Sequence, residues 1–327
     1  MPRRERPAPL ASTNGITALV GSSGPCVPIK TSLLIVASRA PVEPGPSAVL
    51  SVASRVRPTT SRRAFPVPRG CAIMGEGDPG MAGAAEPGSA VGMELIKVES
   101  EAFPVAAVEA LRRAVGDARR LCLGLASGNT MVPVYARLRT EGFAFPPETR
   151  AFAIDEFVWP DADHPGTNAA FFRRHWPAEA GWPPVVVPRA NAHDPDAEIA
   201  RHCRAIAEAG GLDVVLLGIG VNGHIAYNEP GSRRGSTCRV VRLTPATRER
   251  LRPVWHTPPA LAMTLGVREI RAARHVLLLA SGAAKAAALR RALLDDPSPE
   301  VPASFLQDHP QLTVVCDDAA GGLLPIR

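Results

Sequence analysis

From Met93 onward the sequence alternates short, continuous apolar segments with longer segments whose apolar residues recur at helical spacing. The apolar segments predict strands at 95–98, 121–126, 150–154, 185–188, 213–217, 275–280 and 312–316. The segments with helical spacing predict helices at 105–118, 131–139, 197–209 and 283–294. Strands that are apolar along their whole length must be covered on both sides. The alternation therefore predicts an α/β fold: a doubly wound, mainly parallel sheet with helices on both faces.

Residues 1–92 have a different composition from the rest of the chain. They carry 13 of the 34 prolines, and ten Arg and Lys against five Asp and Glu, which leaves five of the six net positive charges in this segment. Such a segment buries too little apolar surface to offset its ordering entropy. We expect a disordered or mis-called N-terminal extension, with an organellar transit peptide as the alternative, and one folded domain at 93–327. Because the charge lies in the extension, we expect no nucleic-acid partner for the folded part.

The six cysteines are scattered and form no C-x-x-C pair. This spacing indicates neither a zinc site nor a redox motif, and it favours reduced, buried cysteines of a cytoplasmic protein. No apolar run approaches the roughly 20 residues needed to span a bilayer, so we expect no membrane partner.

The loop at 218–230 combines glycines, amides, one histidine and one carboxylate directly after a predicted strand. Its glycines match G-x-G-x-x-G, the pattern of a dinucleotide site. That site requires a helix to open at the third glycine, whereas here Pro230-Gly231 indicates a continuing loop. The second interpretation is catalytic, because Glu229 can fold back onto His224 and raise the basicity of its imidazole. A merely hydrogen-bonded structural loop is an equal alternative on this segment alone.

Three other strand ends carry polar residues. The Ser127–Thr130 loop precedes a predicted helix, so its backbone N–H groups can hold an anion, although a side-chain helix cap explains it equally well. Asp155 follows the next strand beside aromatic residues, where a carboxyl can act as a base or be an ordinary loop acid. Lys285 can close on a phosphate or be a surface lysine. Together these groups predict one site for a small phosphorylated molecule.

Residues from about 93 to 320 resemble glucosamine-6-phosphate deaminases, within the larger group that includes 6-phosphogluconolactonases. The matching motifs are LGLASGNT at 123–130, IDEF at 154–157, the 218–230 loop, AMTLG at 262–266, SGAAKA at 281–286 and PASFLQ at 302–307. Asn228-Glu229-Pro230 is typical of the deaminase branch. The resemblance implies a single Rossmann-like catalytic domain that converts glucosamine 6-phosphate to fructose 6-phosphate and ammonia, with no metal or cofactor.

The resemblance also implies roles for individual residues. Asp155 would carry the substrate C2 proton to C1. His224 would shuttle the proton that opens the sugar ring, assisted by Glu229 and Asn222. The groups expected to hold the 6-phosphate are Ser127, Gly128, Asn129, Thr130, Lys285 and, as the arginine that the family places after the His loop, Arg252.

Two other functions on the same fold stay open at this point: lactone hydrolysis and non-catalytic sugar-phosphate sensing. The Glu229 motif disfavours the first, and the absence of a helix-turn-helix pattern disfavours the second. The chain stops soon after Asp317, as in shorter members of the family, so we expect a monomer or small homo-oligomer with weak or absent allostery. The sequence does not distinguish glucosamine from galactosamine phosphate.

Overall fold

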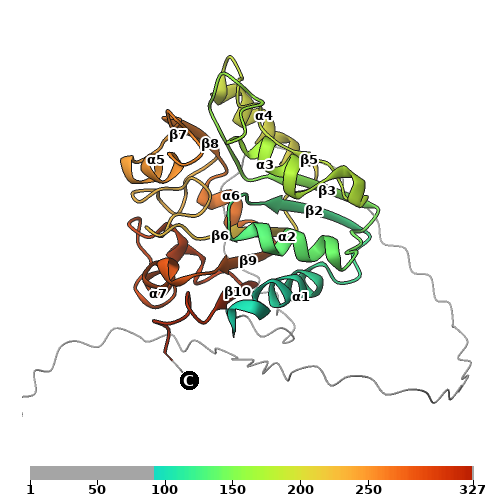
Figure 1. The fold of residues 1–327 in the computed structure, drawn as a ribbon, viewed down its shortest axis with the longest axis vertical. Coiled ribbons are helices and arrows are strands. Elements are labelled where there is room, and N and C mark those ends of the chain that lie inside the picture. Colours follow the sequence, from blue (N-terminus) through green and yellow to red (C-terminus); the bar gives the residue numbers. More distant parts are fainter. Residues whose placement is uncertain (1–91, 326–327) are drawn as a thin grey trace, which may run out of the picture.

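A computed structural model describes residues 92–325. Seven strands form one sheet in the order β1-β10-β9-β6-β2-β3-β5, and every neighbouring pair is parallel (Figure 1). The strands are β1 Glu94–Val98, β2 Arg120–Leu125, β3 Glu148–Ala153, β5 Val185–Val186, β6 Val214–Gly218, β9 His275–Ala280 and β10 Leu312–Asp317. The predicted doubly wound parallel sheet is confirmed. The predictions for residues 1–91 concern a segment outside the described residues.

Helices pack on both faces of this sheet and account for the amphipathic segments. The α-helices are α1 Phe103–Val115, α2 Met131–Thr140, α3 Asn168–His175, α4 Pro195–Glu208, α5 Pro245–Leu251, α6 Val267–Arg271 and α7 Ala286–Leu294. Short 3₁₀ turns lie at η1 Ser100–Ala102, η2 Ala178–Ala180, η3 Ala283–Lys285 and η4 Pro302–Leu306. No helix within residues 92–325 is long and apolar enough to cross a membrane.

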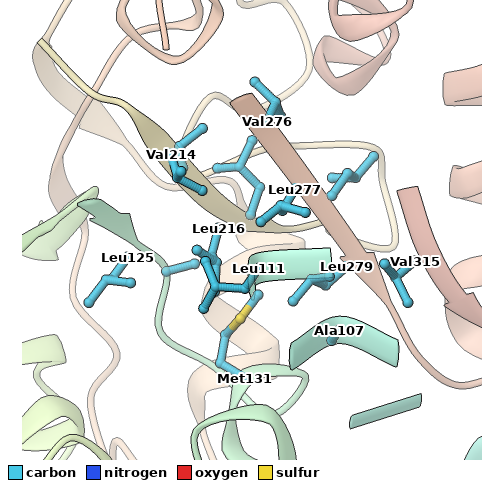
Figure 2. Packing of buried hydrophobic residues seen from close by; sticks show 14 of the residues in the cluster. Ala107, Leu111, Leu125, Met131, Val214, Leu216, Val276, Leu277, Leu279 and Val315 are labelled. Carbon is cyan, nitrogen blue, oxygen red and sulfur yellow. The ribbon is translucent and has the colours of Figure 1, made fainter. Parts of the chain in front are cut away.

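The core lies between α1, α2 and the middle strands. Figure 2 shows Leu111 of α1 and Met131 of α2 beside Leu216 of β6 and Leu279 of β9, all at most 1% exposed. Each such side chain contributes about 1.5–3 kcal/mol to stability by its burial. This packing fixes the middle strands, and with them the loops that leave their carboxyl ends.

The strand order reverses between β2 and β6. The chain runs from β2 outward through β3 to β5, and then returns to the other side of β2 as β6. The loops that follow β2 and β6 therefore leave neighbouring strands in opposite directions and open a crevice. In doubly wound sheets this switch point is where ligands bind.

A second, antiparallel sheet was not predicted. It has the order β4-β8-β7, with β4 at Asp155–Phe157, β7 at Arg239–Arg242 and β8 at Leu261–Thr264. Asp155 pairs with Thr264 in this small sheet. Asp155, which the sequence places after the end of a strand, is thus the first residue of β4. Its pairing with β8 holds its backbone in place.

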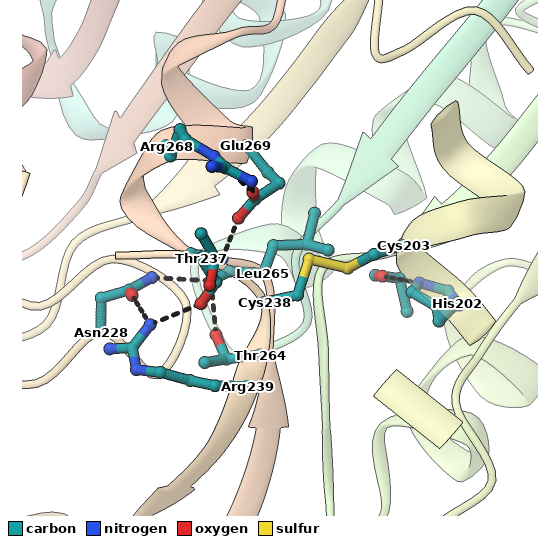
Figure 3. The surroundings of a disulfide bond; sticks show 12 residues. His202, Cys203, Asn228, Thr237, Cys238, Arg239, Thr264, Leu265, Arg268 and Glu269 are labelled. Carbon is teal, nitrogen blue, oxygen red and sulfur yellow. Dashed lines mark hydrogen bonds and ion pairs between the residues drawn. A yellow bond between two sulfur atoms is a disulfide. The ribbon is translucent and has the colours of Figure 1, made fainter. Parts of the chain in front are cut away.

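The expectation of reduced cysteines is wrong for one pair. A disulfide joins Cys203 of α4 to Cys238, just before β7, across 35 residues of sequence (Figure 3). No local spacing motif could reveal this pair, because only the packing of α4 against the small sheet brings the two residues together. Cys122 and Cys316 are free and buried, as expected, while Cys26 and Cys71 lie outside the described residues.

Candidate active site

The loop Ser127–Thr130 joins the end of β2 to the start of α2. Gly128 has a φ of 106°, which favours glycine, and its carbonyl accepts the Met131 N–H at 2.9 Å. Neither Ser127 nor Asn129 caps the helix; Thr130 occupies the N-cap position and makes no side-chain cap bond. The Met131 N–H is thus already bonded and Pro133 has none, but the N–H groups of Gly128, Asn129, Thr130 and Val132 have no partner within the described residues. These four groups can bind an anion beside the N-terminus of α2.

Asp155 and Glu156 form a buried pair of carboxylates with different surroundings. Glu156 is fully buried and accepts the backbone N–H groups of Phe157, Asn168 and Ala169 at 2.7–2.9 Å. Burial raises the pKa of Glu156, while these three donors stabilise its ionised form. Burial, followed by the neighbouring Glu156 charge, raises the pKa of Asp155 to about 8. Burial brings the pKa of Glu156 to about 7, so both carboxyls titrate near neutral pH. Both Glu156 oxygens accept backbone N–H groups, whereas Asp155 Oδ2 accepts no hydrogen bond within residues 92–325. Asp155 is therefore the carboxyl of the pair with an oxygen free to exchange a proton with a ligand.

The loop after β6 brings His224 and Glu229 together. The distance from His224 Nδ1 to Glu229 Oε2 is 3.6 Å, and Nδ1 has no hydrogen-bond partner within the described residues. Asn222 Nδ2 donates to the same Glu229 oxygen at 2.8 Å, and Asn222 Oδ1 accepts the His224 N–H at 3.3 Å. Asn222 thus orients the carboxylate and the loop backbone rather than the imidazole itself.

The Glu229 carboxylate is held ionised. Burial alone would raise its pKa, but the His224 imidazole, the Thr247 hydroxyl and the Asn222 amide together lower it to about 2. The Thr247 hydroxyl of α5 donates to Glu229 Oε1. The ionised carboxylate of Glu229 thus lies 3.6 Å from the imidazole nitrogen, within reach of a histidine that takes part in proton transfer.

Thr264 connects the carboxylate pair to the histidine loop. Its backbone pairs with Asp155 in the small sheet, and its hydroxyl accepts the N–H of Tyr227, three residues after His224, at 3.1 Å. The Tyr227 ring lies 6.5 Å from the His224 ring, centroid to centroid. The charges of Asp155 and Glu229 both raise the pKa of Tyr227, after burial as the main cause. The two acid–base groups thus border one region of the molecule.

Two cationic side chains, Lys285 and Arg250, border the same region. Lys285 Nζ donates to the carbonyl of Ile219, which belongs to the loop after β6, at 2.7 Å. Burial, and then the charge of Arg250, lower the pKa of Lys285. Arg250 Nη2 also donates to the Thr247 hydroxyl at 3.3 Å.

The structure does not bring Arg252 to this group. Its guanidinium pairs with Glu249 at 2.6 Å, and 59% of its side chain is exposed. Residues two positions apart on a helix point in nearly opposite directions, so Arg250 and Arg252 cannot serve the same site. Arg250 is the residue that our sequence reasoning missed, although the run of alternating arginines at 248–252 signals that one of them could face inward.

Sequence reasoning also missed Thr247 and Asn168. Thr247 lies in α5, where the sequence predicts no element, and its only signal is the helix start Thr244-Pro245. Asn168 opens α3 behind the N-cap Thr167, whose hydroxyl accepts the Ala170 N–H. No pattern along the chain connects these two residues with Glu229 or Asp155.

A separate cavity of about 440 Å³ lies at the start of α4. None of the site residues named above lines it, and two of its arginines, Arg189 and Arg201, already pair with the buried Glu198. Within residues 92–325 no group of three or more His, Cys, Asp or Glu side chains is placed to hold a metal ion.

A loop with free backbone N–H groups, two cationic side chains and buried acid–base groups thus meet at the switch point of a doubly wound sheet. This arrangement belongs to an α/β protein whose side chains can hold a small anionic molecule and exchange protons with it. The family described as glucosamine-6-phosphate isomerases/6-phosphogluconolactonase matches residues 100–315. The chain belongs to this family, which confirms the resemblance found in its motifs.

Comparisons with individual proteins distinguish the deaminases from the 6-phosphogluconolactonases of this family. The chain is 37% identical over 212 residues to a glucosamine-6-phosphate deaminase of Geobacillus sp. (strain WCH70), covering 62% of this chain and 84% of that protein. It is 39% identical over 238 residues to the deaminase of Cutibacterium acnes, covering 70% and 91%. It is similar to the solved structure of a monomeric glucosamine-6-phosphate deaminase, with a TM-score of 0.66 and 30% identity over 70% of this chain and 99% of that one.

The likeness to 6-phosphogluconolactonases is more distant. The Trypanosoma cruzi lactonase structure gives a TM-score of 0.57 at 22% identity, over 72% of this chain and 98% of that one. At this identity the comparison shows a shared fold.

Proposed function

We propose that this chain is a glucosamine-6-phosphate deaminase, which isomerises and deaminates glucosamine 6-phosphate to fructose 6-phosphate and ammonia. The observation that carries the proposal is the loop after β6, in which Glu229, the residue typical of the deaminase branch, lies beside His224 and is held by Asn222. The relatives at 37–39% identity are named as deaminases, and they support the same assignment.

The 6-phosphate binds at the two cationic side chains and the loop after β2. The free backbone N–H groups of Gly128, Asn129, Thr130 and Val132 hold its oxygens, and Lys285 and Arg250 neutralise its charge. Side chains of Ser127, Asn129 and Thr130 supply further donors, while Gly128 lets the backbone approach closely. Arg250 takes the role that the sequence assigned to Arg252.

The reaction begins with ring opening at His224. The neutral His224 imidazole accepts the proton of the substrate C1 hydroxyl and delivers it to the ring oxygen, while Glu229 stabilises the transient imidazolium. Asp155 then removes the C2 proton while the C1 carbonyl oxygen takes up a proton from solvent, which leaves an enolamine. Asp155 returns the C2 proton to C1, and the nitrogen releases a proton to solvent, which gives a ketimine. Water adds to the ketimine and ammonia leaves, so that fructose 6-phosphate is the second product. Each general acid–base step contributes about 10²–10⁴-fold to the rate.

A pKa near 8 suits Asp155 to this task, because a weakly acidic carboxyl is a stronger base once it is ionised. The same value predicts that kcat/KM rises as pH increases toward 8, since only the ionised carboxylate accepts the C2 proton. We also propose that the chain acts as a monomer or small oligomer, in line with the monomeric enzyme it is similar to.

The test is ammonia release by the full chain from glucosamine 6-phosphate, galactosamine 6-phosphate and glucosamine. We expect turnover with a 6-phosphorylated amino sugar and little with free glucosamine. Asp155→Asn should still bind the sugar phosphate in calorimetry but release no ammonia. Hydrolysis of 6-phosphogluconolactone without any ammonia release would refute the proposal.

A further inference from the structure

The side chain of Asn168 lies between two parts of the site that are far apart in sequence. Asn168 is 3% exposed, and its Nδ2 donates to Asp155 Oδ1 at 2.6 Å and to the Asp155 carbonyl at 2.9 Å. Its Oδ1 accepts the hydroxyl proton of Ser127 at 2.8 Å. Because both Asp155 atoms are acceptors, the amide nitrogen must face them, and its orientation is fixed.

The start of α3 does not depend on this side chain. Thr167 caps the helix through its hydroxyl, and Glu156 accepts the backbone N–H groups of Asn168 and Ala169. These bonds satisfy the free donors of the first turn. The amide of Asn168 is therefore not needed as a cap, and both of its partners are groups of the proposed active site.

We propose that Asn168 is a positioning residue that couples the phosphate-binding loop at Ser127 to the base Asp155. The proposal rests on the function proposed above and assigns it a residue that neither the sequence motifs nor the comparisons identify. Asn168 acts through Asp155 and Ser127, with no contact of its own to the reacting atoms.

The coupling follows from the number of donors available. Ser127 has one hydroxyl proton, which it gives to Asn168 Oδ1 in this structure. A phosphate oxygen that takes this proton removes one of the two anchors of the amide. The Asn168 amide can then follow the Asp155 carboxylate when the substrate C2 proton moves. Phosphate binding at Ser127 in this way changes the hydrogen bonding of the base Asp155 through the single side chain of Asn168.

The amide also affects the charge state of Asp155. Its hydrogen bond stabilises the ionised carboxylate and lowers the Asp155 pKa, against burial as the dominant cause that raises it. Truncation of Asn168 should therefore raise the Asp155 pKa further. A purely structural role for Asn168 would leave the titration of Asp155 unchanged.

The experiment compares the wild type with Asn168→Ala, Asn168→Asp and Asn191→Ala, an exposed asparagine outside the site that serves as the control. Carboxyl ¹³C NMR follows the titration of Asp155, and kinetics with glucosamine 6-phosphate give kcat, KM and the pH profile. For Asn168→Ala we expect a titration midpoint at least about half a pH unit higher. We expect kcat to fall about 10- to 100-fold with KM within about threefold, and the acid limb of the pH profile to move upward.

Two further comparisons separate coupling from loss of structure. Asn168→Asp keeps the shape and the acceptor for Ser127 but places a second acid against Asp155, so the midpoint should rise here too. Ser127→Ala combined with Asn168→Ala should lose little more activity than the more impaired single variant, because both changes break one chain of hydrogen bonds.

The proposal is overturned if the titration midpoint of Asp155 in Asn168→Ala and Asn168→Asp equals that of the wild type. It is also overturned if the loss of activity in the double variant equals the product of the losses in Ser127→Ala and Asn168→Ala. A wild type that releases no ammonia would defeat the proposed function, while the titration of Asp155 would still decide the role of Asn168. If Asn168→Ala unfolds, Asn168→Ser takes its place in the titration, in the kinetics and in the double variant.

Discussion

The imidazole of His224 lies in the space that a side chain on Gly220 would need. A Cβ built on Gly220 would come within 2.4 Å of the ring, and the Gly220 N–H donates to the His224 carbonyl at 2.9 Å. Gly220→Ala should therefore displace the ring and lower kcat about 100-fold, because an error of about 1 Å in a reacting group costs this much. Steady-state kinetics check it. Gly235→Ala is the matched control, since a Cβ there meets no atom within 4 Å, and equal loss in both variants would contradict the prediction.

Thr247 is expected to hold Glu229 ionised from the neighbouring helix. Thr247→Val removes a donor to the carboxylate, so the Glu229 pKa should rise toward its ordinary value. Glu229 contributes stability above its unfolded pKa of 4.5, and this stability is lost as pH falls toward 2. The variant should start to lose stability at higher pH, and at pH 7 should be less stable by about 1–3 kcal/mol.

Urea unfolding between pH 3 and 7 measures this change. Thr313→Val is the control. Thr313 lies on β10, away from the site, and its hydroxyl donates to Glu94 at 3.0 Å. If that variant shows the same pH dependence, the effect does not belong to Glu229.

The buried Asp155 should make the protein less stable at alkaline pH. Its pKa rises from 3.8 in the unfolded chain to about 8 in the folded one. The folded state therefore binds more protons between these values, and the stability that Asp155 contributes below pH 4 is lost as pH rises through 8. Asp155→Asn carries no charge and escapes this loss. The gain in Tm of the variant over wild type should widen from pH 5 to pH 9, at about 2–4 °C per kcal/mol.

Thermal unfolding of the ligand-free protein over this pH range tests the sign. The exposed Asp296 offers a control, because Asp296→Asn should give no such widening. A gain for Asp155→Asn that shrinks with increasing pH would mean that the carboxylate is stabilised in the folded state.

Arg250 and Arg252 form a natural pair for testing the phosphate end. Arg250→Ala should raise KM about 10- to 100-fold with a smaller change in kcat, because a hydrogen bond to a charged group is worth about 1.5–3 kcal/mol. Arg252→Ala should leave KM within about twofold, since its guanidinium pairs with Glu249 in solvent. Steady-state kinetics and competition by inorganic phosphate measure both effects. The reverse ranking would restore Arg252 to the role suggested by the sequence.

The large sheet was predictable because each of its strands is a local apolar run. The prediction of 275–280 coincides with β9, and those for β2, β3, β6 and β10 differ by one or two residues at their ends. The small sheet was not, because β4, β7 and β8 are three or four residues long and pair only across long stretches of chain. Strands this short carry too few residues to show a period.

The same division holds within the candidate site. Residues that follow long strands, such as Ser127, Asp155 and His224, could be found because the strand rule says where to look. Asn168, Thr247 and Arg250 reach the site from α3 and α5, two helices that the sequence did not predict. Whether such a residue reaches the site depends on which face its helix directs toward the site. Tertiary packing sets this orientation, and the local sequence does not show it.

The disulfide between Cys203 and Cys238 closes a covalent ring of backbone and side chains that includes the proposed catalytic loop. The ring contains β6 and the whole loop with Asn222, His224 and Glu229. A protease that cut once inside this ring would leave a single molecule, whose two pieces would separate only after a reductant was added. The part of the protein with the most exacting geometry is thus also the part that a single backbone break cannot detach.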